Sequence, residues 1–230
     1  MRIYIGYDSK QSDASRVCEH SIRKHFHVSE QYDIVHLKKD ELKNQGIYFP
    51  QNRNPGSTEF SYTRFLVPHL ENYTGWAMFV DSDFLFTENL DSLFREVLDV
   101  GRDTKSVYVC KHPEYVPRED KKFYGIKQEP LPMKNWSSLM IFNCEHPDTK
   151  KLTPISVSNK DPAWLHRFGW TDSKNIGSID LKWNWLVGEH TPGDQLPSGI
   201  HFTNGGPFNE VYGQDYEHIW YSYFKDLDNQ

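Results

Sequence analysis

Short apolar runs alternate along the chain with segments in which apolar residues recur every three or four positions. The runs predict strands, and the periodic segments predict helices. The predicted strands span residues 2–8, 32–37, 76–86, 106–111, 138–143, 183–188 and 200–203. The predicted helices span residues 12–26, 58–70, 88–100, 161–168 and 215–227. This order predicts an α/β fold with a Rossmann-like, mixed but mainly parallel central sheet flanked by helices, in one domain over residues 1–230.

The run at residues 76–86 is the one around which the other elements are arranged. It lacks the alternation of a half-exposed strand, which predicts a strand buried on both faces. Asp81 and Asp83 stand where it ends, and both carboxylates can face one cation if the backbone turns between them. Such a pair would lie at the carboxyl edge of a parallel sheet, and its oxygens suit Mg²⁺ or Mn²⁺. The alternative is a strand that ends in a turn capped by these short polar side chains.

Other positions carry candidate binding chemistry. Gly6 ends the first strand and lets a ligand approach the backbone. Arg64 is a cation early in a predicted helix, where the helix dipole opposes it, so its partner is either a surface carboxylate or a ligand phosphate or sugar hydroxyl. His201 either is a structural histidine or joins the two carboxylates on Mn²⁺. Gly205 and Gly206 follow it and let backbone N–H groups approach a diphosphate.

Two long polar segments, residues 43–57 and 112–133, have no apolar period and predict loops. Loops beside a ligand-binding edge often act as lids. The approach to the strand at 138–143 places the indole of Trp136 beside the hydroxyls of Ser137 and Ser138.

Composition narrows the function classes. The net charge of −6 argues against a nucleic-acid surface and would repel a nucleotide unless a metal or local cations intervene. No apolar run approaches the roughly 20 residues of a membrane span, and the chain starts directly in a strand, so we expect a protein without a membrane span in the cytoplasm, or in the host cytoplasm if a virus encodes it. Cys18, Cys110 and Cys144 lack metal-site spacing and are predicted to be reduced core residues.

The order of these motifs resembles that of the family-8 glycosyltransferases and their relatives with the GT-A fold. The resemblance covers most of residues 2–208 and is strongest at residues 5–8, 62–65, 79–83, 138–143 and 201–207. The stretches 57–61, 134–138 and 183–188 are similar to small bacterial and viral glycosyltransferases, including chlorella-virus enzymes that decorate a capsid protein.

The resemblance implies a GT-A enzyme of the hexosyl- or deoxyhexosyltransferase class that depends on Mn²⁺ or Mg²⁺. Its donor would be a nucleotide diphosphate sugar, usually UDP-linked, and its acceptor a hydroxyl of a glycan or glycoprotein, with retention at the anomeric carbon. The implied metal ligands are Asp81, Asp83 and His201. The implied donor-binding residues are Gly6, Tyr7 and Asp8 for the base, Ser82 for the ribose, Arg64 for the diphosphate or donor sugar, and Gly205 and Gly206 for the phosphates.

The sequence departs from the family pattern in two places. The family usually has a lysine shortly before the Pro-aromatic pair, whereas Gly206 precedes Pro207 here, so Arg64, Lys121 or Lys122 would have to supply the cation. An Asp-rich acceptor segment is also missing. The corresponding region holds His166, Arg167 and Asp172, of which Asp172 is the candidate catalytic carboxylate. Trp136, Ser137 and His166 are the candidate substrate-binding residues.

Three other functions remain open. An Asp-x-Asp phosphohydrolase would use the first aspartate as nucleophile, but it usually has a hydroxyl residue where Leu85 stands. A non-catalytic sugar-binding domain would explain the aromatic content of 15% without a metal. A nucleotidyltransferase is disfavoured because no Gly-rich basic loop follows the first strand. Within the favoured function, an inverting reaction would need a base such as Asp172 or Glu129.

Overall fold

A mixed sheet forms the middle of the protein in the computed structural model, which describes residues 1–25, 32–51, 54–100, 105–113 and 133–228. The strand order is β2-β1-β3-β6-β5-β7. The strands are β1 (Arg2–Gly6), β2 (Asp33–Leu37), β3 (Trp76–Val80), β5 (Val107–Cys110), β6 (Leu139–Asn143) and β7 (Ile176–Ile179). Strand β6 runs antiparallel to both neighbours and the other pairings are parallel. The predicted mixed, mainly parallel sheet is therefore confirmed.

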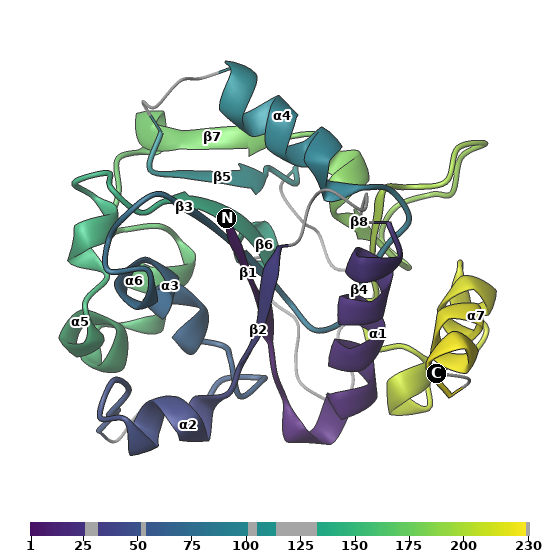
Figure 1. Ribbon diagram of the computed structural model, residues 1–230, viewed down its shortest axis with the longest axis horizontal. Helices are drawn as coiled ribbons and strands as arrows, with labels where there is room; N and C mark the ends of the chain where they lie inside the picture. The colour runs from purple at the N-terminus through teal and green to yellow at the C-terminus, as the bar shows by residue number, and fades with distance from the viewer. Residues whose placement is uncertain (26–31, 52–53, 101–104, 114–132, 229–230) are drawn as a thin grey trace.

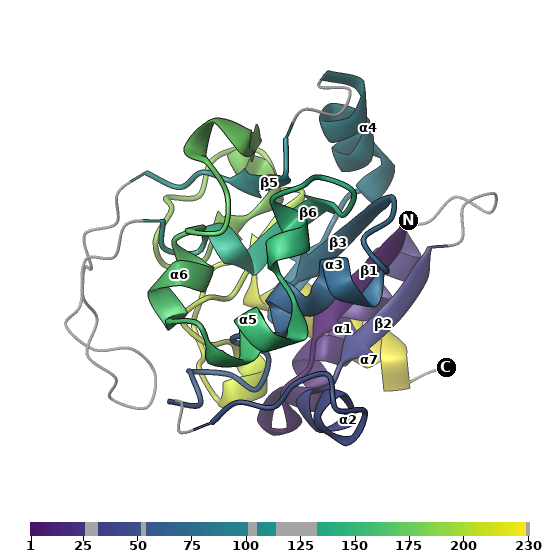
Figure 2. The same ribbon diagram turned by 90° about the vertical axis from the view of Figure 1, so that its left-hand side faces the viewer.

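Helices cover both faces of this sheet (Figure 1). On one face, α1 (Ser12–Lys24) and α4 (Leu90–Val100) pack their apolar side chains against β1, β3, β5 and β6. On the other face lie α2 (Lys39–Asn44), α3 (Val67–Leu70), α5 (Pro154–Asn159) and α6 (Pro162–His166). Figure 2 views the molecule from the side of α3, α5 and α6. Burial on both faces explains why β3 and β6 are apolar throughout.

A second, smaller sheet has the order β4-β9-β8. Its strands are β4 (Phe84–Phe86), β8 (Trp185–Leu186) and β9 (Gly199–His201). Together with α1 and α7 (Glu217–Asp228), it encloses a separate apolar cluster around Leu85 and Trp220. The chain passes from the central sheet to the small sheet between Val80 and Phe84. The predicted strand at 76–86 is thus two strands in different sheets, because the chain turns at the acidic residues.

Other predictions differ in detail. The expected helix at 58–70 is a 3₁₀ turn, Thr63–Leu66, followed by α3 with Pro68 in its first turn, where a missing N–H is tolerated. Helices α2 and α5 and strand β7 were not predicted. Much of the predicted loop at 112–133 lies outside the described residues. Cys18, Cys110 and Cys144 are free and buried, as expected.

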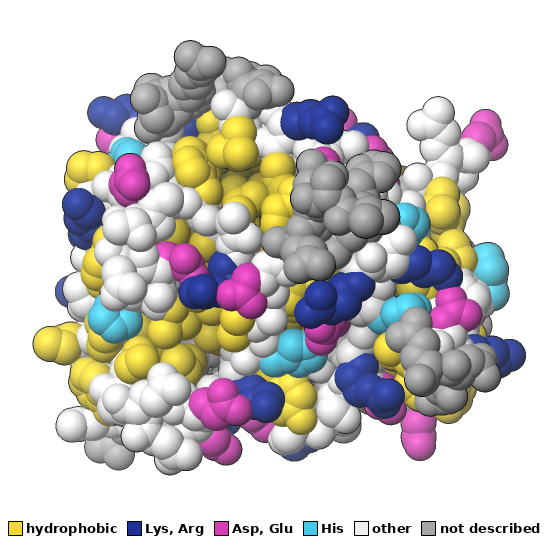
Figure 3. Space-filling view, in the orientation of Figure 1, with side chains coloured by type: hydrophobic (Ala, Val, Ile, Leu, Met, Phe, Trp, Pro, Cys, Tyr) yellow, Lys and Arg dark blue, Asp and Glu magenta, His cyan; other side chains and the backbone are white. Residues whose placement is uncertain are grey.

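The surface shows no strong separation of charge on the face in Figure 3, where basic and acidic side chains are interspersed. None of the helices in the described ranges combines the length and apolar character needed to cross a membrane.

Candidate metal centre

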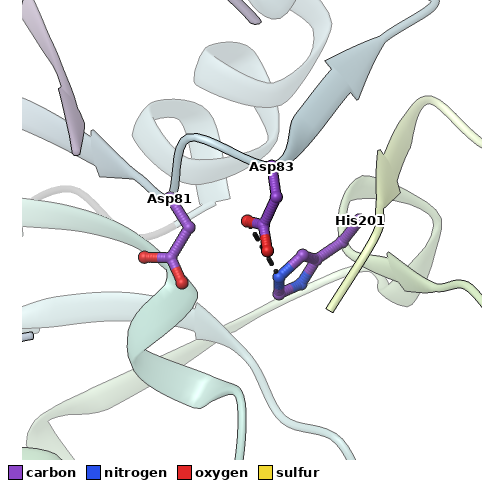
Figure 4. Close-up of side chains that lie close together, drawn as sticks. All are labelled: Asp81, Asp83 and His201. Atoms are coloured by element: carbon purple, nitrogen blue, oxygen red, sulfur yellow. Dashed lines mark ion pairs between the residues drawn. The ribbon is translucent and has the colours of Figure 1, made fainter. Parts of the chain in front are cut away.

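Two aspartates and a histidine meet at the junction of the two sheets. Asp81 and Asp83 lie in the turn between β3 and β4, and His201 ends β9 (Figure 4). One ligand atom from each side chain lies within 4.8 Å of the others, and His201 Nε2 is 3.2 Å from Asp83 Oδ1. Ligand atoms on an ion with bonds of about 2.1 Å lie roughly 3 to 4.2 Å apart, so small side-chain rotations would bring all three onto one cation.

Strand pairing brings these residues together. The Asp81 N–H donates to the Ser138 carbonyl (2.8 Å), which fixes the start of the turn on β6. The Phe202 N–H donates to the Asp83 carbonyl (3.0 Å), and Phe84 is the register partner of His201. The ring of Phe84 also stacks on the imidazole at 4.3 Å. The antiparallel pairing of β4 with β9 therefore places a distant histidine beside the acidic turn.

The hydrogen bonds of Asn184 define the state of His201. The Asn184 amide nitrogen donates to the Asn135 carbonyl (3.3 Å) and to Ser138 Oγ (2.9 Å), so its oxygen is the atom that faces His201 Nδ1 at 2.8 Å. Since that oxygen can only accept, Nδ1 carries the hydrogen. Nε2 is then the ring atom that faces the Asp83 carboxylate, 3.2 Å away, where either a proton or a metal ion can bridge the two groups. This donor set fits a divalent ion such as Mn²⁺.

Arg64 is the partner of Asp81. Its Nη1 lies 2.7 Å from Asp81 Oδ1 and donates to the Ser137 carbonyl (2.9 Å), while the guanidinium lies over the rings of Phe60 and Phe79. Burial lowers the pKa of Arg64, although the two aspartates favour its charged form. The buried guanidinium thus has a partly buried carboxylate partner. Arg64, Asp81 and Asp83 together carry one net negative charge, which favours a metal ion.

The first strand places Tyr7 and Asp8 at the same carboxyl edge, but Gly6 has a packing role there. A Cβ on Gly6 would lie 2.6 Å from the ring of Phe60, so glycine makes room for that ring. The Asp8 carboxylate accepts from the N–H groups of Lys10 (3.0 Å) and Glu59 (3.1 Å), which ties β1 to the segment before the 3₁₀ turn. Tyr7 is partly exposed at this edge, with Lys38 Nζ 5.5 Å from the centre of its ring, and its contact with a nucleotide base stays a prediction.

The other predicted donor-binding residues lie near the metal ligands. Ser82 is fully buried between the two aspartates, and within the described part of the chain its Oγ has no hydrogen-bond partner. Gly205 has a φ of +92°, which favours glycine, and its N–H donates to the Phe202 carbonyl. A Cβ on Gly206 would lie 2.7 Å from the ring of Phe208. Local packing therefore accounts for the glycine pair, and its contact with phosphates stays a prediction.

Two of the predicted substrate-binding residues, Trp136 and Ser137, lie in the 3₁₀ turn before β6, and the third, His166, ends α6 beside Ser137. Ser137 Oγ and His166 Nδ1 are 3.0 Å apart, and the Trp136 indole N–H donates to the His112 carbonyl (3.1 Å). Asp172 does not join them. It is exposed and caps a 3₁₀ turn before β7, whose first residue pairs with the amino end of β5. Asp172 thus lies at the opposite edge of the sheet from Asp81.

Glu129, Lys121 and Lys122 lie outside the described residues. Sequence reasoning assigned no role to Asn184, although the stretch 183–188 was among those carrying the resemblance. His112 and His190, which lie near the metal centre, had no distinguishing sequence signal.

Comparison with known proteins adds a relative that matches over the full chain. The chain is 37% identical to Protein CDI of Arabidopsis thaliana over 235 residues, covering 100% of this chain and 88% of that protein. No family model matches the sequence.

Solved glycosyltransferase structures share the fold. The Streptococcus pneumoniae glycosyltransferase GlyE superposes with a TM-score of 0.63 at 12% identity, over 97% of this chain and 59% of that chain. The chain thus spans well under two thirds of GlyE. A glycosyltransferase involved in glycosylation of the major capsid of PBCV-1 superposes with a TM-score of 0.52 at 13% identity, over 91% of this chain and 96% of that chain. The fold is therefore of the GT-A glycosyltransferase type.

Proposed function

The chain belongs to the family of Arabidopsis thaliana Protein CDI, and on this premise we propose that it is a metal-dependent glycosyltransferase. The observation that carries the proposal is the group of Asp81, Asp83 and His201 at the carboxyl end of β3, within a fold shared with glycosyltransferases. A capped turn alone would account for neither the distant histidine nor its fixed tautomer.

Each residue of the group has a defined task in this proposal. Asp81, Asp83 and His201 hold Mn²⁺ or Mg²⁺. When bound, the ion supplies positive charge next to the departing diphosphate. Arg64 positions the Asp81 carboxylate through its 2.7 Å ion pair. Asn184 holds His201 with Nε2 directed at the metal position.

The donor in this proposal is a UDP-linked sugar, with its base at Tyr7 on the carboxyl edge of β1. The acceptor is a hydroxyl of a glycan or glycoprotein. The bond between the anomeric carbon and the diphosphate oxygen breaks with its electron pair on that oxygen. The acceptor oxygen bonds to the same face of the anomeric carbon, and its proton passes to the departing phosphate oxygen. Asp172 lies at the far edge of the sheet, so it is badly placed to act as the base that an inverting reaction would need.

A nucleotide-release assay tests the proposal. The protein is incubated with several UDP-sugars and a pool of free saccharides, with Mn²⁺ or with a chelator, and free UDP is measured. We expect release that requires Mn²⁺ and that the Asp83→Ala variant loses by at least about a hundred-fold. Full activity in that variant would contradict the proposal. Metal-dependent phosphate release from simple phosphoesters, without UDP release, would favour the phosphohydrolase instead.

A further inference from the structure

A second histidine group lies beside the candidate metal centre. The rings of His112 and His190 are 5.4 Å apart between centroids. The His190 Nδ1 accepts from the Leu186 N–H (3.2 Å). His112 is only 7% exposed, and neither of its ring nitrogens has a hydrogen-bond partner among the residues that the structure describes. A buried imidazole with both polar atoms unsatisfied is costly, so its presence calls for a ligand.

Strand register places His112 at the edge that holds the metal ligands. The carboxyl ends of β3 and β5 both meet the amino end of β6, through the pairs Val80 with Leu139 and Val109 with Met140. His112 lies two residues after the end of β5, and its carbonyl accepts from the indole N–H of Trp136. In the sheet, β3 and β6 lie between β5 and β1, and the proposed site for the nucleotide base is at β1. His112 therefore lies on the other side of the metal ligands from that site.

The chemistry of this pair suits an uncharged polar ligand. Burial, together with the nearby His190 and His201, lowers the pKa of His112 to about 3, so its imidazole is neutral. A neutral imidazole offers one donor and one acceptor, which matches hydroxyl groups and gives no positive charge to a phosphate. A second metal centre is not indicated, because the Asp-Asp-His cluster is the group of suitably spaced ligands found among the described residues.

We propose that His112 binds a sugar hydroxyl, with His190 beside it on the same subsite. This inference rests on the proposed function and extends it to the residue that selects the saccharide. The hydroxyl belongs either to the glycosyl part of the donor or to the acceptor saccharide. Trp185 packs edge-on against His190 at 4.7 Å and holds its ring in place.

The test compares wild type with His112→Phe, which keeps the ring and removes both polar atoms. Titration calorimetry with Mn²⁺ measures the affinity for UDP alone and for UDP-glucose, UDP-galactose and UDP-N-acetylglucosamine. Saturation-transfer NMR with UDP and Mn²⁺ present measures the binding of free mono- and disaccharides. We expect UDP affinity to stay within two-fold of wild type. Either the affinity for UDP-sugars or the affinity for free saccharides should fall by about five- to ten-fold. A loss for UDP-sugars identifies the donor as the source of the hydroxyl, and a loss for free saccharides identifies the acceptor.

Two further variants separate a binding role from a structural one. His112→Gln keeps a donor and an acceptor and should restore part of the affinity. His20→Phe is a control on α1, because His20 Nε2 lies 3.9 Å from Asp226 Oδ2 and its ring packs against Tyr223 of α7. We expect this substitution to leave the affinities for UDP-sugars and for free saccharides unchanged. The ligand-free His112→Phe protein should melt about 2–4 °C higher, since an unsatisfied group is removed.

The possible failures are distinguishable. If His112→Phe binds every UDP-sugar and saccharide as tightly as wild type, the sugar subsite is wrong and the proposed function stands. If His112→Phe loses UDP affinity to the same extent as UDP-sugar affinity, His112 supports the nucleotide site and the inference is again wrong. If wild type binds no UDP in the presence of Mn²⁺, the proposed function fails, and the inference fails with it.

Discussion

Individual residues at the sheet junction have roles that follow from their contacts. Arg64 is buried with a carboxylate on one side and two aromatic rings on the other, so its charge is matched by one specific partner. Gly6 is required by the ring of Phe60. The ligand contacts that the resemblance implied for Arg64 and Gly6 stay predictions, whereas these packing roles predict the effect of a substitution on stability.

Arg64→Met keeps the length and apolar stem of the side chain and removes its charge. Asp81 would then be left partly buried without its cation, which typically costs about 3 kcal/mol in the free energy of unfolding. Urea denaturation without metal measures this loss. Arg16→Met is the matched control, because Arg16 forms an exposed pair with Asp13 and should cost less than about 0.5 kcal/mol. Equal effects of the two substitutions would contradict the role given to Arg64.

Gly6→Ala adds one methyl group, whose carbon would lie 2.6 Å from the Phe60 ring. We expect a loss of about 1–3 kcal/mol in unfolding free energy, measured by urea denaturation. Gly193→Ala, where a Cβ meets nothing within 4 Å, should change stability by less than about 0.5 kcal/mol. A second substitution, Phe60→Leu, should relieve part of the Gly6→Ala defect. Without such relief, the clash with Phe60 would not be the cause.

At the scale of elements, local pattern predicted much of the fold. The apolar runs of β1, β2, β3, β5 and β6 and the helical spacing of α1, α4 and α7 were visible because each element buries its own face. Strand β7 was missed because Gly177 and Ser178 are weak strand formers. A Cβ on Gly177 would lie 2.2 Å from the Tyr108 ring, so the neighbouring strand determines this position.

The candidate site was predicted only in part, because local sequence pattern reveals some of its residues and not the contacts between distant elements. Asp81 and Asp83 are separated by one residue, so their proximity could be inferred. His201 was a candidate third ligand in the sequence, but the pairing of β4 with β9 that brings it to Asp83 could not be predicted from local pattern. Asn184 could not be assigned a role, because its function lies in a hydrogen bond across two elements that no periodicity encodes.

Asn184 links the segment before β8 to the histidine at the end of β9, and its removal should loosen the metal centre. In Asn184→Leu, His201 loses the acceptor for Nδ1–H, so both tautomer and ring orientation become free. We expect Mn²⁺ affinity to fall by about 10- to 100-fold, measured by titration calorimetry. Asn184→Asp retains an acceptor oxygen and should bind Mn²⁺ more tightly than Asn184→Leu. Wild-type affinity in Asn184→Leu would refute a positioning role.

At the scale of the whole molecule, contacts between α1 and its neighbours connect the two sheets. Glu19 on α1 bonds to His36 on β2 at 2.7 Å, and α1 also packs against β4 and α7. The helix therefore fixes the position of the small sheet, and with it His201, relative to β3. A change in pH that weakens the contacts of α1 should therefore also disturb the position of His201.

Low pH should weaken the hydrogen bond between Glu19 and His36. The hydrogen bond to His36 lowers the pKa of Glu19 to about 2, below the unfolded value of about 4.3. A carboxyl whose pKa is depressed by folding contributes stability above the unfolded value, and the contribution is lost as pH falls towards 2. Glu19→Gln should therefore be less stable than wild type by about 1–2 kcal/mol at pH 7, after allowance for partial exposure. The difference should vanish near pH 2 in urea denaturation, and a pH-independent difference would contradict this role.

Anomalous diffraction from crystals soaked with Mn²⁺ and UDP shows whether Asp81, Asp83 and His201 hold one divalent cation. We expect a manganese peak about 2.0–2.3 Å from a carboxylate oxygen of each aspartate and from His201 Nε2, with the diphosphate completing the coordination. Bound UDP without a manganese peak between these three side chains would contradict this expectation.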